Sequence, residues 1–158
     1  MAKIKMIAAT LCYVRKGGKT LMLHRVKKAN DVHEGKWNGL GGKFELGESP
    51  EECVVREIRE ESGLTIIKPD LRGILTFPGF DGEHDWLVFL FTADKFRGKL
   101  DKNSNEGNIE WIPDSKLLNL PLWEGDRLFL KWLKNKKFFS AKFIYKKGRL
   151  KSYQAVFH

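Results

Sequence analysis

From Gly42 to Leu64 the chain reads GKFELGESPEECVVREIREESGL, and this stretch carries its clearest helix signal. Ser49 can cap a helix through its hydroxyl, and Glu52 completes a Ser-x-x-Glu capping box. Pro50 suits the first helical turn, and Gly63 is a natural stop. We therefore predict a helix within this stretch. Its apolar face would be formed by Cys53, Val54 and Ile58.

The predicted helix carries three carboxylates at positions that share one face. Glu57, Glu60 and Glu61 stand at i, i+3 and i+4, and residues with this spacing are neighbours on a helix surface. Like charges placed this way repel one another, so they need either good solvation or a bound cation. A solvated acidic face is one interpretation. A Mg²⁺ site is the other, because Mg²⁺ prefers carboxylate oxygens, water and substrate phosphates.

Apolar alternation and turn signals predict strands on both sides of this helix. The predicted strands are 4–14, 20–26, 37–42, 64–67, 72–77, 86–93, 110–112, 139–145 and 150–157. A second helix is predicted at 124–133, and a helical turn at 115–118. Mixed strands with few helices indicate an α+β protein or a layered α/β/α sandwich. The length of 158 residues fits one domain, 1–158.

The net charge of +9 is concentrated near the C-terminus. Residues 131–158 hold nine Lys and Arg residues and no Asp or Glu, so residues 1–130 are neutral overall. A basic segment can attract nucleic acid or polyphosphate. Cations that alternate with apolar residues also suit the solvated face of a hairpin, and we favour that interpretation.

Cysteine usage and hydropathy bear on the cellular compartment. Cys12 and Cys53 lie in apolar runs, and two cysteines cannot build a disulfide framework. No apolar run is long enough to span a membrane. We expect a cytoplasmic protein.

The spacing of the residues around the helix resembles the Nudix box, the signature of a family of hydrolases. The matching positions are Gly42, Glu48, Arg56-Glu57-Ile58, Glu60-Glu61 and Gly63-Leu64. The resemblance implies a Nudix-type α/β/α sandwich with a mixed sheet and a loop–helix–loop catalytic motif. It also implies hydrolysis of a nucleoside diphosphate linked to another group.

The resemblance further implies a magnesium site, with Mn²⁺ as a possible substitute. Glu57 and Glu61 would be the principal metal ligands, with Glu60 close behind and the carbonyl of Gly41 as a further ligand. Glu48 and Arg56 would orient the carboxylates and complete the catalytic set. The bound metal would neutralise phosphate charge and activate a water molecule.

A base or a further metal ligand in this family usually comes from outside the box. Glu106 is the first candidate for this role and Glu110 the second. Both also read as ordinary loop carboxylates.

Two further stretches resemble the MutT-like branch that hydrolyses 8-oxo-dGTP and other oxidised purine nucleoside triphosphates. Residues 36–43 read KWNGLGGK, and Asn38 would read the purine edge with its donor and its acceptor. Trp123 would stack on the base, and Asp126 would form a hydrogen bond with it. Gly125 stands where the best-known members have the first of two adjacent acids. Alternatively, Asn38 is a turn residue and Trp123 starts a core-packed helix.

Arg25 and Lys43 are candidates for contacts with the phosphates. Arg25 follows a predicted strand, and Lys43 follows the first glycine of the box.

Three functions therefore compete. The first is hydrolysis of 8-oxo-dGTP to the monophosphate and diphosphate, which would sanitise the nucleotide pool and serve DNA repair. The second is a Nudix hydrolase of another nucleotide, such as an RNA 5′-triphosphate end, ADP-ribose or a dinucleoside polyphosphate. The third is a non-catalytic nucleotide-binding module, which would have no need of the complete glutamate set.

Overall fold

The computed structural model describes residues 5–27, 29–102 and 107–158. The strands are β1 (Met6–Lys16), β2 (Lys19–His24), β3 (Trp37–Asn38), β4 (Thr65–Ile67), β5 (Asp70–Phe77), β6 (Asp85–Ala93), β7 (Lys95–Arg97), β8 (Asn108–Pro113), β9 (Phe139–Lys146) and β10 (Arg149–Phe157). The helices are α1 (Pro50–Ser62), α2 (Asp114–Leu117) and α3 (Glu124–Trp132).

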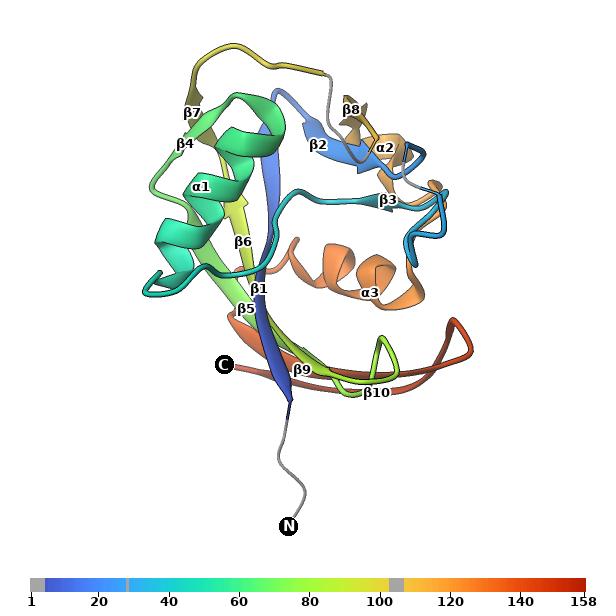
Figure 1. Cartoon of the computed structure of the whole chain (residues 1–158). Helices are drawn as coiled ribbons and strands as arrows, with labels where there is room; N and C mark the ends of the chain where they lie inside the picture. The colour runs from blue at the N-terminus through green and yellow to red at the C-terminus, as the bar shows by residue number, and fades with distance from the viewer. Residues whose placement is uncertain (1–4, 28, 103–106) are drawn as a thin grey trace.

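A mixed sheet forms the centre of the molecule (Figure 1). Its strands run in the order β10-β9-β5-β6-β1-β2-β3, and β8 also pairs with β2. The β1–β6 and β5–β9 pairs are parallel, whereas the other pairs of this sheet are antiparallel. The predicted mixed sheet is therefore confirmed.

The two faces of the sheet are covered by different helices. Tyr13 of β1 packs in a core with Phe129 of α3, whereas its neighbours Cys12 and Val14 pack in a second core with Ile58 of α1. Side chains alternate between faces along a strand, so β1 contributes to both cores. Both layers are visible in Figure 1, with α1 and α3 on opposite sides of the sheet. This arrangement confirms the predicted sandwich.

Helix α1 has the ends that the sequence predicts. The Ser49 hydroxyl accepts a hydrogen bond from the backbone N–H of Glu52, and the Glu52 carboxylate accepts one from the backbone N–H of Ser49. Gly63 closes the helix in the left-handed region at φ 79°, where glycine carries no steric penalty. The buried residues of α1 include the three predicted apolar ones, Cys53, Val54 and Ile58.

Strand boundaries differ from the sequence prediction where tertiary pairing decides them. Strand β7 was not expected, and it forms a two-stranded sheet with β4. Strand β8 extends beyond the predicted 110–112 because every one of its residues pairs with β2. The predicted strand 37–42 is regular only at β3, and Leu40 and Lys43 make isolated bridges to β1. Short local sequence patterns do not show which distant strand a segment will pair with.

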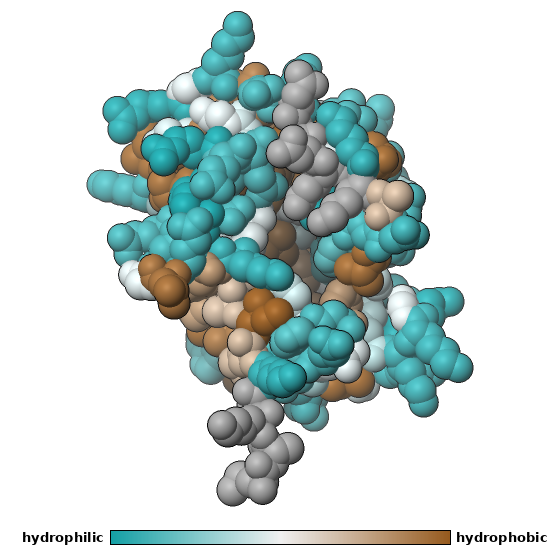
Figure 2. All heavy atoms as spheres, in the orientation of Figure 1, coloured by the Kyte–Doolittle hydropathy of each residue, from teal (hydrophilic) through white to brown (hydrophobic). Residues whose placement is uncertain are grey.

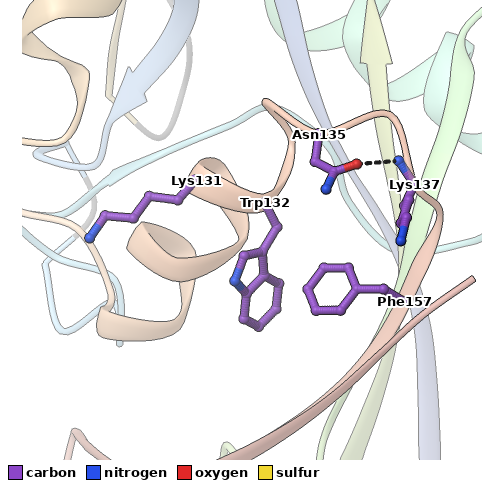
Figure 3. Close-up of a pocket in the computed structure, with 5 residues that line it drawn as sticks. All are labelled: Lys131, Trp132, Asn135, Lys137 and Phe157. Atoms are coloured by element: carbon purple, nitrogen blue, oxygen red, sulfur yellow. Dashed lines mark hydrogen bonds between the residues drawn. The ribbon is translucent and has the colours of Figure 1, made fainter.

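A cavity of about 370 Å³ opens at the C-terminal end of α3 (Figure 3). It is lined by Lys131, Trp132, Asn135, Lys137 and Phe157. Trp132 and Phe157 face each other with their ring centroids 5.4 Å apart, whereas Lys131 points away from both. None of these residues belongs to the Nudix-like segment, so this cavity is separate from the predicted site.

No helix in the described ranges is long and apolar enough to cross a membrane.

Candidate active site

The loop before α1 is fixed to β1 by backbone hydrogen bonds. Cys12 and Leu40 exchange N–H···O bonds of 2.6 and 3.1 Å, and the N–H of Thr10 donates to the carbonyl of Gly42 at 2.9 Å. Backbone groups alternate in direction along an extended chain, so those of Gly41 point away from β1. The Gly41 N–H accordingly donates to Oε1 of Glu61 on α1 at 3.0 Å.

Two glycines bring the loop against the acidic side of α1. A Cβ on Gly41 would lie 2.1 Å from the Thr10 carbonyl oxygen, and a Cβ on Gly42 would lie 2.5 Å from the carboxylate of Glu57. Neither position has room for a side chain unless its neighbours move. The glycine pair therefore places Glu57 and Glu61 beside the loop backbone.

Arg56 connects the acids of this segment. Its Nε and Nη2 donate to the two oxygens of Glu48 at 2.6 and 2.9 Å. Its Nη1 donates to Glu57 at 2.8 Å and to Glu60 at 3.1 Å, and Nη2 also reaches the carbonyl of Lys43 at 3.0 Å. Paired, fork-shaped contacts of this kind orient carboxylates. Arg56 therefore links Glu48, Glu57 and Glu60, and the orienting role of Arg56 and Glu48 stays a prediction.

The charges of this network stabilise one another. Hydrogen bonds from the Arg56 side chain and from the backbone N–H of Glu45 lower the pKa of Glu48 to about 2. The hydrogen bonds that Arg56 donates to Glu48 raise the pKa of Arg56 further above its already high usual value. One cation thus offsets the repulsion between neighbouring acids on α1.

Replacing Glu48 with glutamine is expected to lower the melting temperature at pH 7, with a smaller difference at low pH. The folded-state pKa of Glu48 is depressed to about 2, so its ionised form stabilises the fold above its usual pKa of 4.5. This stabilisation is lost as the pH falls through about 2. Melting curves from pH 7 to pH 2 test this, and a difference that stays constant over the range would contradict it.

The acidic residues fit a magnesium site built partly from the loop. The outer surface of α1 is hydrophilic (Figure 2), and the donors beside it are carboxylate and carbonyl oxygens. Among the described residues no three His, Cys, Asp or Glu side chains are grouped closely enough to hold a metal by themselves. Glu57 and Glu60 both contact Arg56, while Glu61 contacts Gly41. This arrangement is compatible with Mg²⁺, which is usually bound through one or two carboxylates, with water and substrate phosphates completing its coordination.

Further polar groups lie buried on the two sides of the sheet: Asn38 pairs in register with Leu23 of the core on the α1 side, whereas Tyr13 and Asp126 lie on the α3 side. The Nδ2 atom of Asn38 and the hydroxyl of Tyr13 are buried and have no hydrogen-bond partner among the described residues. Asp126 is 7% exposed, and burial raises its pKa to about 7 against the opposing charges of Lys36 and Arg127. Buried polar groups are normally satisfied. Within the described part of the chain, Asn38 and Tyr13 therefore lack the protein partners that buried polar groups normally have.

Trp123 is held in place by a ring of neighbours. Its Nε1–H donates to Nδ1 of His33 at 2.8 Å, and the Lys36 ammonium lies over its ring, 5.1 Å from the centroid. Phe80 and Tyr145 pack against it at centroid distances of 5.0 and 5.4 Å. Trp123 is only 7% exposed. A base that stacks on the Trp123 ring would therefore also contact Lys36 or Phe80.

His33 keeps the form that accepts the bond from Trp123. Burial and the nearby charge of Arg25 lower its pKa to about 4, and the charge of Asp31 opposes this shift. The ring is therefore neutral above about pH 5, with Nδ1 free of a proton and able to accept.

Sequence reasoning did not single out His33, Phe80 or Tyr145. They come from the loop before β3, the turn after β5 and strand β9, and they meet only in the folded chain. The one local signal was an aromatic residue, Phe80, inside a turn with glycines on both sides, Gly79 and Gly82.

The remaining predicted residues lie in varied surroundings. Arg25 Nε is paired with Asp31 at 2.8 Å, which braces the loop before β3. The Lys43 ammonium lies 5.5 Å from the Trp86 ring centroid. Glu110 pairs in register with Met22, whose side chain belongs to the core on the α3 side, so Glu110 is not brought to α1. Glu106 lies outside the described residues.

Known proteins resemble this chain over most of its length. Residues 5–133 match the family model of the NUDIX domain. An oxidized purine nucleoside triphosphate hydrolase of Danio rerio is 34% identical over 135 residues, 85% of this chain and 83% of the relative. An uncharacterized Nudix hydrolase of Bacillus subtilis is 38% identical over 120 residues, 74% of this chain and 72% of the relative.

The fold agrees with these matches. The crystal structure of the MutT protein from Bacillus halodurans superposes with a TM-score of 0.85 at 33% identity, covering 94% of this chain and 97% of the other.

The site combines a glycine loop with the glutamates of a capped helix, on one face of a mixed sheet. Together with the matches above, it identifies a pyrophosphohydrolase of a class that generally depends on a divalent metal. The chain belongs to the Nudix family, whose members act on nucleotide substrates.

Proposed function

We propose that the protein hydrolyses oxidised purine nucleoside triphosphates, 8-oxo-dGTP among them, to the nucleoside monophosphate and diphosphate. The observation that carries this proposal is the buried carboxyl group of Asp126 in the first turn of α3, which begins at Trp123, across the sheet from the acidic helix. The similarity to an oxidized purine nucleoside triphosphate hydrolase supports the same substrate class. In this role the protein acts as one domain in the cytoplasm.

The residues of α1 and its loop would act on the phosphates. Mg²⁺ held by Glu57, Glu61 and the Gly41 carbonyl, with Glu60 nearby, would neutralise phosphate charge and lower the pKa of a water molecule. Arg56 holds Glu57 and Glu60 in place, and Glu48 holds Arg56. Lys43 and Arg25 are the proposed phosphate contacts, and Glu106 is the proposed base or further ligand.

Asn38 of β3 and the residues at the start of α3 would select the base. A purine offers both donors and acceptors along its edge, and Asn38 can match either. Asp126 donates a hydrogen bond when protonated and accepts when ionised, and its pKa of about 7 makes both forms available near neutral pH. Trp123 supplies an aromatic surface, which His33 keeps in one orientation.

Purified protein with Mg²⁺ is expected to turn over 8-oxo-dGTP at least about tenfold more efficiently than dGTP, measured as kcat/KM. Chromatography of the products should show the monophosphate and diphosphate, and EDTA should abolish turnover. The same panel should include ADP-ribose and a dinucleoside polyphosphate. Equal or faster turnover of either one would replace the proposal with a Nudix hydrolase of that nucleotide.

A further inference from the structure

Gly125 and Tyr145 form a contact that leaves no room for a side chain at position 125. The backbone N–H of Gly125 donates to the Tyr145 hydroxyl at 2.7 Å. A Cβ on Gly125 would lie 2.8 Å from that hydroxyl and 2.9 Å from Cδ1 of Phe143. The tyrosine hydroxyl therefore fills the space beside Asp126 that another side chain would need.

The Tyr145 ring is fixed from several sides. It packs nearly perpendicular to Phe80 and to Trp123, with centroid distances of 5.3 and 5.4 Å. These rings come from the turn after β5, the start of α3 and strand β9. The hydroxyl is thus placed by ring packing and by the Gly125 hydrogen bond together.

The hydroxyl group of Tyr145 can still donate one hydrogen bond. Its oxygen accepts from Gly125, and among the residues that the structure describes no acceptor lies within hydrogen-bond distance of its O–H. Burial raises the pKa of Tyr145 well above its usual value, with the charge of Asp126 adding to the effect. The group therefore keeps its proton and remains a donor.

We propose that the Tyr145 hydroxyl is a specificity-determining hydrogen-bond donor of the nucleobase site, held beside Asp126 by Gly125. This inference rests on the proposed function. A donor at this place favours a base that presents a carbonyl oxygen and disfavours one that presents an amino group, because two opposed donors leave one of them unsatisfied. The site then selects purines of the guanine type, oxidised or not, over purines of the adenine type.

Calorimetric titration without metal tests this independently of catalysis, with 8-oxo-dGMP and dAMP as probes. The wild type is expected to bind 8-oxo-dGMP more tightly than dAMP. Tyr145→Phe keeps the ring and removes the donor, so it should lower this preference by up to about tenfold. Tyr153→Phe is the matched control, because Tyr153 is a 47% exposed tyrosine on the neighbouring strand β10, and it should change nothing.

Gly125→Ala is a second test of the same inference. The added Cβ would displace the Tyr145 hydroxyl and should lower the preference for 8-oxo-dGMP over dAMP. An unchanged preference in Tyr145→Phe, or an equal loss for both probes, overturns the inference and leaves the proposed function standing. If the wild type binds neither probe, this inference is overturned, whereas the proposed function fails only if 8-oxo-dGTP is not turned over with Mg²⁺.

Discussion

Replacing Glu57 with glutamine is expected to lower kcat at least about 100-fold, with little change in melting temperature. The Glu57 carboxylate lies against Gly42 and accepts from Arg56 at 2.8 Å, so it is oriented on the loop side of α1. Glutamine keeps the size of the side chain and can still accept from Arg56, but it lacks the charge that binds Mg²⁺. Steady-state kinetics with 8-oxo-dGTP over a range of Mg²⁺ concentrations measure the effect.

Glu51→Gln is the matched control for this substitution. Glu51 is an exposed glutamate in the first turn of the same helix, outside the contacts of Arg56. It should retain wild-type kcat and the wild-type dependence on Mg²⁺. If activity survives both the loss of Glu57 and treatment with EDTA, the mechanism is not metal-assisted. If the wild type binds nucleotides but does not turn them over, the protein is a nucleotide-binding module.

Local sequence was sufficient to predict helix α1 and its ends. Helix signals act over a few residues: the Ser49–Glu52 capping box and the Gly63 stop lie where the sequence places them. The family resemblance implied orienting roles for Arg56 and Glu48, but their pairing at 2.6 Å is seen only in the structure. The sequence therefore predicted the helix and its ends, and not the contacts between its side chains.

The α3 side depends on contacts that no local pattern contains. Trp123 was predicted to take part in base recognition, but His33, which accepts its N–H, lies 90 positions away in the chain. Tyr145 reaches Gly125 through the position of β9 beside β5 in the sheet. Strand β7 is a similar case, since its pairing with β4 is set by the surrounding fold. These contacts are determined by the arrangement of the strands and helices in the folded chain.

The position of Trp123 is compatible with both roles that the sequence left open for it. It starts α3 and is nearly buried, as a core residue would be. Its neighbours are nonetheless the polar and aromatic groups of the proposed base site, including Lys36 and His33. A tryptophan that is packed on its edges keeps a fixed orientation, and a fixed ring loses less entropy when a base stacks on it.

Asp126→Asn is expected to make the protein more stable than the wild type at pH 8 and about equally stable at pH 4. Burial raises the folded-state pKa of Asp126 from 3.8 to about 7. As the pH rises from about 4 to about 7, the unfolded chain releases this proton first, so the wild type loses stability over that window. The loss has an upper limit of about 4 kcal/mol, and asparagine, which does not ionise, avoids it. Denaturant unfolding at pH 4, 6 and 8 measures the difference.

The same titration should appear in catalysis. If protonated Asp126 donates to the base, kcat/KM for 8-oxo-dGTP should fall in the wild type as the pH rises through about 7. The asparagine side chain of the variant offers a donor at every pH, so this fall should be absent even where the absolute rate is lower. Asp70→Asn, at an exposed position in β5, is the control and should keep the wild-type profile. A variant that loses the same stability at all three pH values, and keeps the alkaline fall in kcat/KM, would show that Asp126 is ionised throughout and recognises the base solely as an acceptor.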